Sequence, residues 1–344
     1  MAVVGPLDNG RGRFVAGGFD AEDNHRCIIG VMAQSGSEAP ILRIGSRGSP
    51  LALVQAREVQ SRLAAASGVP AERIVIKVIR TTGDIVQDRP LADAGGKGLF
   101  AKEIEEALLA GGIDLAVHSS KDLPTFLPSG LVLAGFLPRE DARDAFVSRK
   151  AAMLRDLPVG AVVGTASPRR HALVKRLRPD LRLVSLRGNV ETRLRKLDAG
   201  EADATVLAVA GLKRLGLLSA ARVILDPDEF VPAVGQGAIG LEIRADDART
   251  RAFVATIADA DTATAVMAER AFLAVLDGSC RTPIGGHAIV SGDAIRFHGI
   301  IVKPDGSEAF EVLRDGPREA ASEFGADAGR ELRERASADF FVRA

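Results

Sequence analysis

The sequence contains no tryptophan and no tyrosine, and only two of its 344 residues are cysteine. Without those aromatic rings, a stacking platform for single-stranded nucleic acid is not expected. Two cysteines, Cys27 and Cys280, do not make a disulfide framework, and such sparse usage is typical of a reducing cytoplasm. The five histidines are scattered, and no histidine–cysteine spacing resembles a metal site. No apolar run is long enough to cross a membrane.

Charges of the two signs are balanced: lysine and arginine number 45, aspartate and glutamate also number 45, and the formal net charge is zero. Such a chain has no general field that would recruit nucleic acid or an anionic membrane. Arginine far outnumbers lysine and often stands in short clusters, which favours local, planar recognition of anions. A length of 344 residues exceeds one ordinary core and suits two or three domains.

The first 40 residues lack a strong periodic pattern. They are rich in glycine and mixed in charge, without the basic stretch and following apolar stretch of a secretory signal. Asp20, Glu22 and Asp23 argue against a transit peptide. We expect residues 1–40 to be a disordered leader, and Met32 is an alternative start of translation.

Two series of alternating strands and helices follow. Apolar and β-branched runs predict strands at residues 42–45, 74–79, 113–117 and 131–136, and then at 161–163, 181–184 and 205–209. Helices are predicted after Ser49-Pro50 and again after Ser167-Pro168, with serine as the cap and proline in the first turn. Another helix is predicted after Asn189, and one at residues 99–109.

Alternation of this kind indicates parallel-type sheets with helices on both faces. The repeated order of strand, glycine turn, Ser-Pro and helix predicts two similar, doubly wound α/β lobes that face one cleft. Residues 231–237 are predicted to cross between the lobes, and 238–243 to form a strand. Helix 262–276, short strands from His287 and a final helix at 317–335 predict a small α+β domain at the C-terminus.

The polar end of the strand predicted at 113–117 is the first candidate site. Ser119, Ser120, Lys121 and Asp122 follow this apolar run, and Pro124 prevents simple continuation of the strand. In open α/β sheets, ligands bind beyond the carboxyl ends of the strands. Asp122 is therefore a candidate functional residue, although on this stretch alone solvated loop charges are the commoner explanation.

Three predicted helix amino-ends carry arginine. They are Arg47 with Ser49-Pro50, Ser167-Pro168 with Arg169 and Arg170, and Arg187 with Gly188-Asn189. A helix amino-end offers free N–H groups and partial positive charge, and a guanidinium adds a planar fork for carboxylate or phosphate. Together with Arg193 and Arg214, they suggest a ligand with many anionic groups. For any one arginine, pairing with an acidic residue is about equally plausible.

Two further segments have candidate roles. Residues 81–98 are polar and glycine-bearing, which predicts either a lid or a disordered connection, with Lys97 near its tip. The Gly95–Gly98 run lacks the spacing of a nucleotide-binding phosphate loop. Cys280 lies in a loop of small residues next to Arg281, where a thiolate is favoured. Cys280 is either a covalent attachment point or an inert thiol.

Several motifs, taken in order, resemble the hydroxymethylbilane synthase (porphobilinogen deaminase) family. They are RIGSRGSPLA from Arg43, GGKGLF from Gly95, AVHSSKDLP from Ala116, SLRGNV from Ser185, LAVAGLKRLG from Leu207, PAVGQGA from Pro232 and GSCRTPIGG from Gly278. The resemblance extends from Ile41 to the C-terminus and is weakest after Gly286.

The resemblance implies three domains: residues 41–138 with 237–258, residues 139–236, and residues 259–344. It implies a monomeric cytoplasmic transferase of tetrapyrrole (porphyrin, haem) biosynthesis. Such an enzyme condenses four porphobilinogen molecules head to tail, releases ammonia, and frees hydroxymethylbilane by hydrolysis. The chain would grow on a dipyrromethane cofactor that is joined to Cys280 by a thioether.

Residue roles implied by the resemblance fall into four groups. Asp122 is the catalytic carboxylate, expected to stabilise the azafulvenium cation left when ammonia departs. The cofactor would be lined by Ser119, Lys121, Thr165, Ser167, Arg169, Arg170 and Gly188. Substrate and chain side groups would be bound by Arg47, Ser49, Arg187, Arg193, Arg214 and Gln236. Lys97 and Phe100 would belong to the mobile loop. No metal, nucleotide, nucleic acid or membrane partner is implied.

Two other classes of protein remain to be distinguished. A two-lobed solute-binding protein for a small polyanion would use the same helix ends and arginines, but it needs a signal peptide and neither Cys280 nor Asp122. A regulatory ligand-binding domain is the second alternative, although no helix-turn-helix with a basic face is visible. Intact-protein mass spectrometry would separate these classes, because only the enzyme carries a dipyrromethane.

Overall fold

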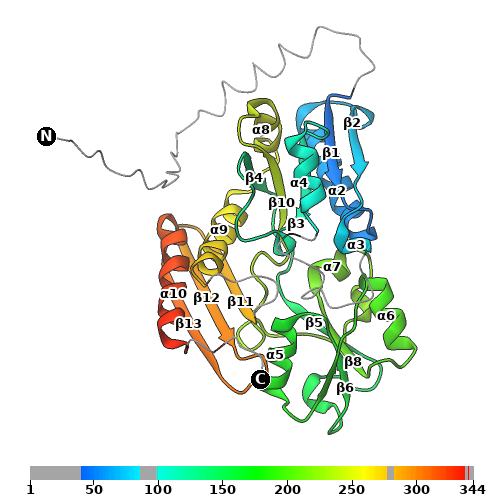
Figure 1. Cartoon of the computed structure of the whole chain (residues 1–344), viewed down its shortest axis with the longest axis vertical. Helices are drawn as coiled ribbons and strands as arrows, with labels where there is room; N and C mark the ends of the chain where they lie inside the picture. Colours follow the sequence, from blue (N-terminus) through cyan, green and yellow to red (C-terminus); the bar gives the residue numbers. More distant parts are fainter. Residues whose placement is uncertain (1–39, 86–97, 99, 277–282, 338–339, 341–344) are drawn as a thin grey trace, which may run out of the picture. The chain divides into compact units, whose positions relative to one another are not determined.

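The computed structural model describes residues 40–85, 98, 100–276, 283–337 and 340 (Figure 1). Almost all of the predicted leader and most of the expected lid lie outside these residues. The described part contains three β-sheets with helices packed against them. Across the described residues, no helix combines the length and apolar character that a membrane crossing requires.

The first sheet joins four early strands to one strand from much later in the chain. Its strands are β1 (Leu42–Ser46), β2 (Ile74–Val78), β3 (Leu115–Ser119), β4 (Leu131–Phe136) and β10 (Ile239–Arg244). Their order across the sheet is β2-β1-β3-β10-β4. β1, β2 and β3 are parallel, whereas β10 runs antiparallel to both β3 and β4.

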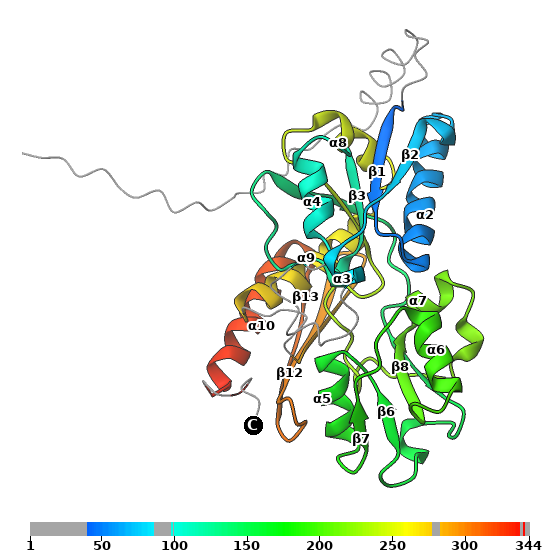
Figure 2. The same ribbon diagram turned by 45° about the vertical axis from the view of Figure 1, so that its right-hand side comes forward.

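Helices cover both faces of this sheet, as Figure 2 shows for α2 and α4. α2 (Pro50–Ser67) is capped by Ser49 and ends at Gly68, which adopts a φ of 70°. Apolar residues of α2 and α8 (Ala248–Ala255) share one core with β1 and β10. α4 (Lys102–Leu109) packs on the opposite face through Ile104 and Leu108. The described chain also includes α3 (Thr82–Ile85), where the Thr82 N–H donates to Glu103 Oε1 of α4 at 2.9 Å.

The second sheet repeats this arrangement with other segments. It contains β5 (Asp144–Ser148), β6 (Val162–Gly164), β7 (Arg182–Val184), β8 (Ala204–Ala208) and β9 (Val223–Ile224), in the order β7-β6-β8-β5-β9. Three parallel strands are followed by one antiparallel strand and then by an edge strand. α5 (Pro168–Leu177) packs on one face, and α6 (Val190–Asp198) and α7 (Val209–Arg214) pack on the other.

The chain crosses twice between these sheets, through residues 137–143 and again through residues 225–238. β5, which follows the first crossing, occupies the fourth position of the second sheet. β10, which follows the second crossing, occupies the fourth position of the first sheet. Each crossing therefore leads into an antiparallel strand beside a central one: β5 beside β8 in the second sheet, and β10 beside β3 in the first.

The third sheet consists of β11 (Ile284–Ser291), β12 (Ala294–Val302) and β13 (Ala309–Pro317), all antiparallel. α9 (Ala260–Val275) and α10 (Ala321–Arg335) pack with this sheet in one core. Glu269 of α9 is fully buried and contacts both crossings. Its carboxylate accepts hydrogen bonds from Arg139 Nη1 at 2.6 Å and from the Gly235 N–H at 2.6 Å.

The α/β class predicted from the sequence is confirmed, with three differences in detail. The sheets are mixed rather than purely parallel, because β10 and β5 insert in the antiparallel sense. β5 was not predicted at all. β3 lies two residues later than expected and includes His118 and Ser119, because both polar side chains find buried partners.

The final helix also differs from the prediction. α10 begins at Ala321, not at Pro317, because β13 continues through Pro317 at the edge of its sheet. Short 3-10 turns complete the described chain at Ala71–Arg73, Ser120–Asp122, Leu154–Asp156, Leu218–Ala220 and Arg318–Ala320.

Candidate active site

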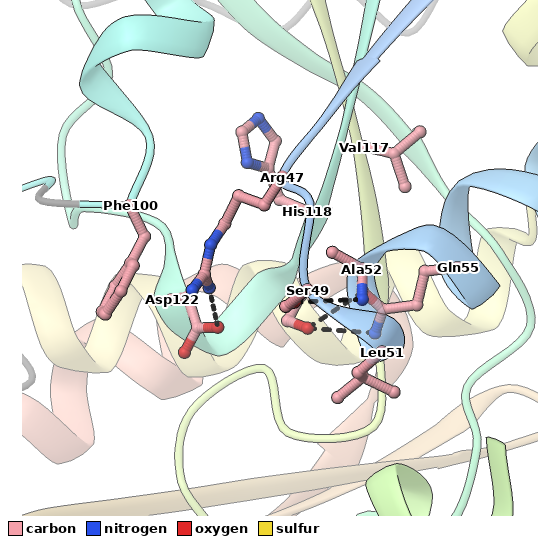
Figure 3. A pocket seen from close by; sticks show the side chains of 10 residues that line it. Arg47, Ser49, Leu51, Ala52, Gln55, Phe100, Val117, His118 and Asp122 are labelled. Atoms are coloured by element: carbon pink, nitrogen blue, oxygen red, sulfur yellow. Dashed lines mark hydrogen bonds and ion pairs between the residues drawn. The ribbon is translucent and has the colours of Figure 1, made fainter. Parts of the chain in front are cut away.

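The candidate site begins where β3 ends, in the 3-10 turn Ser120–Asp122. The Asp122 side chain is 39% exposed, and its Oδ2 lies 4.0 Å from Nη1 of Arg47. The Phe100 ring lies beside the same guanidinium, with 4.1 Å from Arg47 Cζ to the ring centroid (Figure 3). Arg47 is therefore close to both an aromatic ring and a partly exposed carboxylate.

A pocket of about 50 Å³ opens at this point. Its lining comes from β3, from Phe100 and from the start of α2: Arg47, Ser49, Leu51, Ala52, Gln55, Phe100, Val117, His118, Ser119 and Asp122. Ser119 does not point freely into it, because its hydroxyl and the Gln55 amide are hydrogen-bonded, with a distance of 2.9 Å from Nε2 to Oγ. The volume is well below the roughly 300–1,000 Å³ of ordinary ligand sites, so it accommodates only part of a ligand.

The three predicted helix caps form as expected. Ser49 Oγ accepts from the Ala52 N–H, and Ser167 Oγ accepts from the Arg170 N–H, both at 3.4 Å. Asn189 Oδ1 accepts from the N–H of the residue three positions later at 2.8 Å. Each cap fixes the start of a helix next to an arginine that the sequence had marked.

Arg169 and Arg170 share one buried carboxylate, that of Asp144 at the start of β5. Arg169 Nη2 donates to Asp144 Oδ2 at 2.7 Å, and Arg170 Nη2 donates to Oδ1 at 2.7 Å. Burial alone would raise the pKa of Asp144, but the charges of the two guanidinium groups outweigh it and hold that pKa far below its ordinary value. One anion therefore faces two cations, and the group retains excess positive charge.

Lys121 joins this group through Gln236. Lys121 Nζ donates to Gln236 Oε1 at 3.1 Å, and Gln236 Nε2 donates to Asp144 Oδ1 at 3.0 Å. Burial, together with the nearby charge of Arg170, lowers the pKa of Lys121 to about 8. Gln236, only 1% exposed, thus links the residue before Asp122 to the carboxylate that holds the two arginines.

Arg193 and Arg187 bring further positive charge from the start of α6. Burial is the main reason that the pKa of Arg193 falls to about 10; the charges of Arg170 and Arg187 act in the same direction, and Asp122 opposes them. Arg193 is therefore close enough to each of these three side chains for their charges to interact. Arg193 Nε also donates to the Gly188 carbonyl at 2.9 Å.

The remaining described candidates lie around this centre. Thr165 Oγ1 accepts from the Ser167 N–H at 3.2 Å, which shapes the turn before α5. Gly188 has a φ of 116°, and an added Cβ would lie 2.5 Å from Thr192 Cγ2. Arg214 instead contacts the second crossing and α2: its Nη2 donates to the Gly237 carbonyl at 2.9 Å, and its Nε lies 3.8 Å from Glu58 Oε2.

Comparison with known families agrees with this arrangement of residues. A family model described as "Porphobilinogen deaminase, dipyromethane cofactor binding domain" matches residues 42–252, and one described as "Porphobilinogen deaminase, C-terminal domain" matches residues 263–334. The chain belongs to the porphobilinogen deaminase family. A porphobilinogen deaminase of Nitrobacter hamburgensis is 65% identical over 310 residues, which cover 90% of this chain and 98% of that protein. One of Paracoccus denitrificans is 58% identical over 300 residues, covering 87% and 96%.

Solved structures of more distant proteins are also similar. The methionine-binding protein MetQ has a TM-score of 0.42 at 16% identity, covering 64% of this chain and 91% of that chain. A nutrient-binding protein of Burkholderia cenocepacia has a TM-score of 0.41 at 17% identity, covering 64% and 93%.

Two predicted residues of this porphobilinogen deaminase family member, Cys280 and Lys97, lie outside the described residues. Within the described residues, no group of three or more histidine, cysteine, aspartate or glutamate side chains is arranged to hold a metal ion.

Sequence reasoning missed two features of the site. Asp144 was not among the residues predicted for the site. The available signal was the apolar run of residues 145–147 directly after it. The second is the buried pair of His118 and Glu242, whose partners are 124 positions apart and share no local pattern.

Proposed function

We propose that this chain catalyses the porphobilinogen deaminase reaction. Four porphobilinogen molecules are joined head to tail with loss of ammonia, and water then releases hydroxymethylbilane. Membership of the family over most of the chain supports this reaction. A place in tetrapyrrole, and so porphyrin and haem, biosynthesis follows from the product.

One observation in the structure carries the proposal: the partly exposed carboxylate of Asp122 lies among several cations. Asp122 is close to Arg47 and interacts electrostatically with Arg193 and Lys121. Porphobilinogen carries an acetate and a propionate, which these cations would bind. Loss of ammonia leaves a positive charge, which the Asp122 carboxylate would stabilise.

We assign the catalytic role to Asp122 itself. Its carboxylate would accept a hydrogen bond from a pyrrole N–H and stabilise the cation formed from the incoming substrate. It would also hold or move the proton lost when two rings join. Six residues would bind the substrate and the side groups of the growing chain: Arg47, Ser49, Arg187, Arg193, Arg214 and Gln236.

The residues present suit a dipyrromethane, whose pyrrole rings carry carboxylates. Arg169 Nε is buried and, among the described residues, has no hydrogen-bond partner, so this arginine retains a donor for a ligand. Lys121, Arg170, Ser119, Thr165, Ser167 and Gly188 complete the proposed lining. Cys280 would hold the group through a thioether. When bound, the cofactor supplies the pyrrole carbon on which the chain grows.

The domain division and the cellular setting are also proposals. The domains would be residues 41–138 with 237–258, residues 139–236, and residues 259–344, with Lys97 and Phe100 on a mobile loop. The enzyme would act as a cytoplasmic monomer without nucleic-acid or membrane partners, which the zero net charge and sparse cysteine favour. Light scattering and cell fractionation test these points.

Intact-protein mass spectrometry tests the function directly. Wild-type protein should carry the extra mass of a dipyrromethane, and porphobilinogen should then add a ladder of pyrrole units. Cys280→Ser should lack this mass. Cys27→Ser, which alters the only other cysteine, should retain it. An unmodified wild-type protein, or modification that survives in Cys280→Ser, would contradict the proposal.

A further inference from the structure

Three ionisable side chains are buried together beside the candidate site, and one of them, His118, also lines its pocket. His118 Nε2 lies 2.9 Å from Glu242 Oε2, and the two side chains are 5% and 0% exposed. Glu105, on the buried side of α4, is 6% exposed. The proposed reaction uses none of them, so their burial needs another explanation.

The sheet places all three on one face. His118 in β3 pairs with Gly240 of β10, and Glu242 lies two residues further along β10, so the two side chains project from the same side. Ala116 projects from this side too and belongs to the core that α4 completes. Glu105 approaches from α4, which contacts β1, β3, β4 and β10.

Glu105 and Glu242 each have one carboxylate oxygen without a hydrogen-bond partner among the described residues. In both side chains this oxygen is Oε1, and it is buried. Burial and, after it, the charge of Glu242 raise the pKa of Glu105 to about 7, against the opposing effect of His118. A carboxyl in such a place is protonated over much of the acidic range and loses its proton near neutrality.

The surrounding elements add few other charges. Glu106 of α4 raises the pKa of Glu105 slightly, and Arg270 of α9 interacts with Glu242 while it donates to the carbonyls of Pro124 and Thr125 at 2.9 Å. β4 contains no ionisable residue, and Arg43 of β1 is paired with Asp114. Arg244 of β10 donates to the Leu108 carbonyl at the end of α4 and is paired with Asp247. The balance within the group therefore depends mainly on Glu105, Glu242 and His118.

We propose that Glu105 is a positioning residue for the proposed reaction: its protonated carboxyl keeps α4 packed on β3, and its ionisation disturbs the strand that carries Ser119 to Asp122. With Glu105 neutral, the group holds one carboxylate, which faces His118. With Glu105 ionised, it holds two carboxylates in a buried place, and the repulsion acts between α4 and β10. Both ends of the site depend on this packing, because Phe100 lies two residues before the start of α4 and His118 directly precedes Ser119.

This inference rests on the proposed function, and the matched variants Glu105→Gln and Glu106→Gln test it. Both substitutions remove one carboxylate from α4, but the Glu106 side chain is 62% exposed. With porphobilinogen as substrate, wild-type kcat should fall as the pH rises through about 7, with KM much less affected, because positioning rather than binding is disturbed. Glu105→Gln should lose this decline, and Glu106→Gln should retain it.

Urea unfolding across the same pH range gives a readout that does not need activity. A carboxyl whose folded pKa is raised stabilises the fold below its unfolded pKa, and that stability is lost as the pH rises through the folded value. Wild-type protein and Glu106→Gln should therefore lose stability between about pH 4.5 and 7 relative to Glu105→Gln.

Each result bears on one claim. An unchanged decline of kcat in Glu105→Gln would overturn the inference, even if the stability difference appeared, because the group would then be structural only. Equal pH dependence of stability in all three proteins would also overturn it. A protein without pyrrole mass on Cys280 would refute the proposed function instead, and the stability comparison would still be measurable.

Discussion

The Asp144 carboxylate lies 2.7 Å from guanidinium nitrogens of both Arg169 and Arg170, and none of the three side chains is more than 6% exposed. Gln236 is a third partner of this carboxylate, with its Nε2 at 3.0 Å from Oδ1. One buried anion therefore orients two cations that the proposed cofactor needs. Removing one member of a buried ion group leaves the others uncompensated, which is far more costly than losing an exposed pair.

Asp144→Asn should therefore destabilise the fold and disturb the site together. We expect a loss of about 3–5 kcal/mol in the free energy of unfolding, because two buried guanidinium groups lose their counterion. The matched control is Asp198→Asn, since Asp198 is 52% exposed and pairs with an exposed Arg149. It should cost less than about 1 kcal/mol. Urea unfolding measures both values, and similar costs would contradict the assigned role.

The charge on Asp144 should persist into strong acid. Because its folded pKa is far below the ordinary value, its contribution to stability is present above the unfolded pKa and is lost only as the pH falls toward the folded one. The difference between wild type and Asp144→Asn should thus be constant above about pH 4 and shrink steadily as the pH falls below that value.

Asp122→Asn, unlike Asp144→Asn, should reduce turnover strongly and change stability little. The Asp122 side chain is 39% exposed and its contact with Arg47 is long, at 4.0 Å, so its loss should change stability by less than about 1 kcal/mol. Turnover should fall by about 10²–10³-fold, because the charge that stabilises the substrate cation is removed. Rapid-quench mass spectrometry should show the pyrrole ladder forming slowly. Near-wild-type turnover would refute the catalytic assignment.

Local features of this chain were predictable and long-range ones were not. Ser49, Ser167 and Asn189 cap the helices that the sequence indicated, because a cap depends on the next three residues only. The insertion of β10 between β3 and β4 has no local signal, since its partners are more than 100 residues away. Antiparallel pairing in both sheets was missed for the same reason.

In the candidate site, too, individual residues were predictable and the contacts between them were not. Asp122 and the arginines stood out because ligands bind beyond strand ends and anions bind at helix amino-ends, and because these residues lie in motifs that resemble the family. The residues that hold these side chains in place could not be identified from the sequence. Asp144 reaches Arg170 across 26 positions, and the link from Lys121 to Gln236 spans 115 positions, so only the fold shows that these side chains meet.

Lys121 should titrate near neutrality when the cofactor is absent. Burial and the charge of Arg170 lower its pKa to about 8, and both favour the neutral amine. In Cys280→Ser, carbon NMR of labelled lysine should show one amine that titrates near that value, and Lys121→Arg should remove this signal. Wild-type protein should show a higher value, because cofactor carboxylates favour the charged form. A midpoint at the ordinary lysine value, about 10.4, in Cys280→Ser would contradict this prediction.

The second crossing should be intolerant of any side chain at Gly237. Its φ is 89°, and an added Cβ would lie 2.2 Å from the Glu140 carbonyl oxygen in the first crossing. Gly200 is a matched control, because its φ is 80° and its Cβ would have no atom within 4 Å. Gly200→Ala should cost roughly 1–2 kcal/mol, from the backbone conformation alone.

Gly237→Ala should cost clearly more than that control, because the two crossings must also move apart. It should lower activity too, since the Gly237 carbonyl accepts from Arg214 and the preceding Gln236 connects Lys121 to Asp144. Urea unfolding and initial rates with porphobilinogen measure the two effects. If the two alanine variants lost the same free energy of unfolding, the two crossings could move apart at little cost. The close contact between them would then have no role in holding the site.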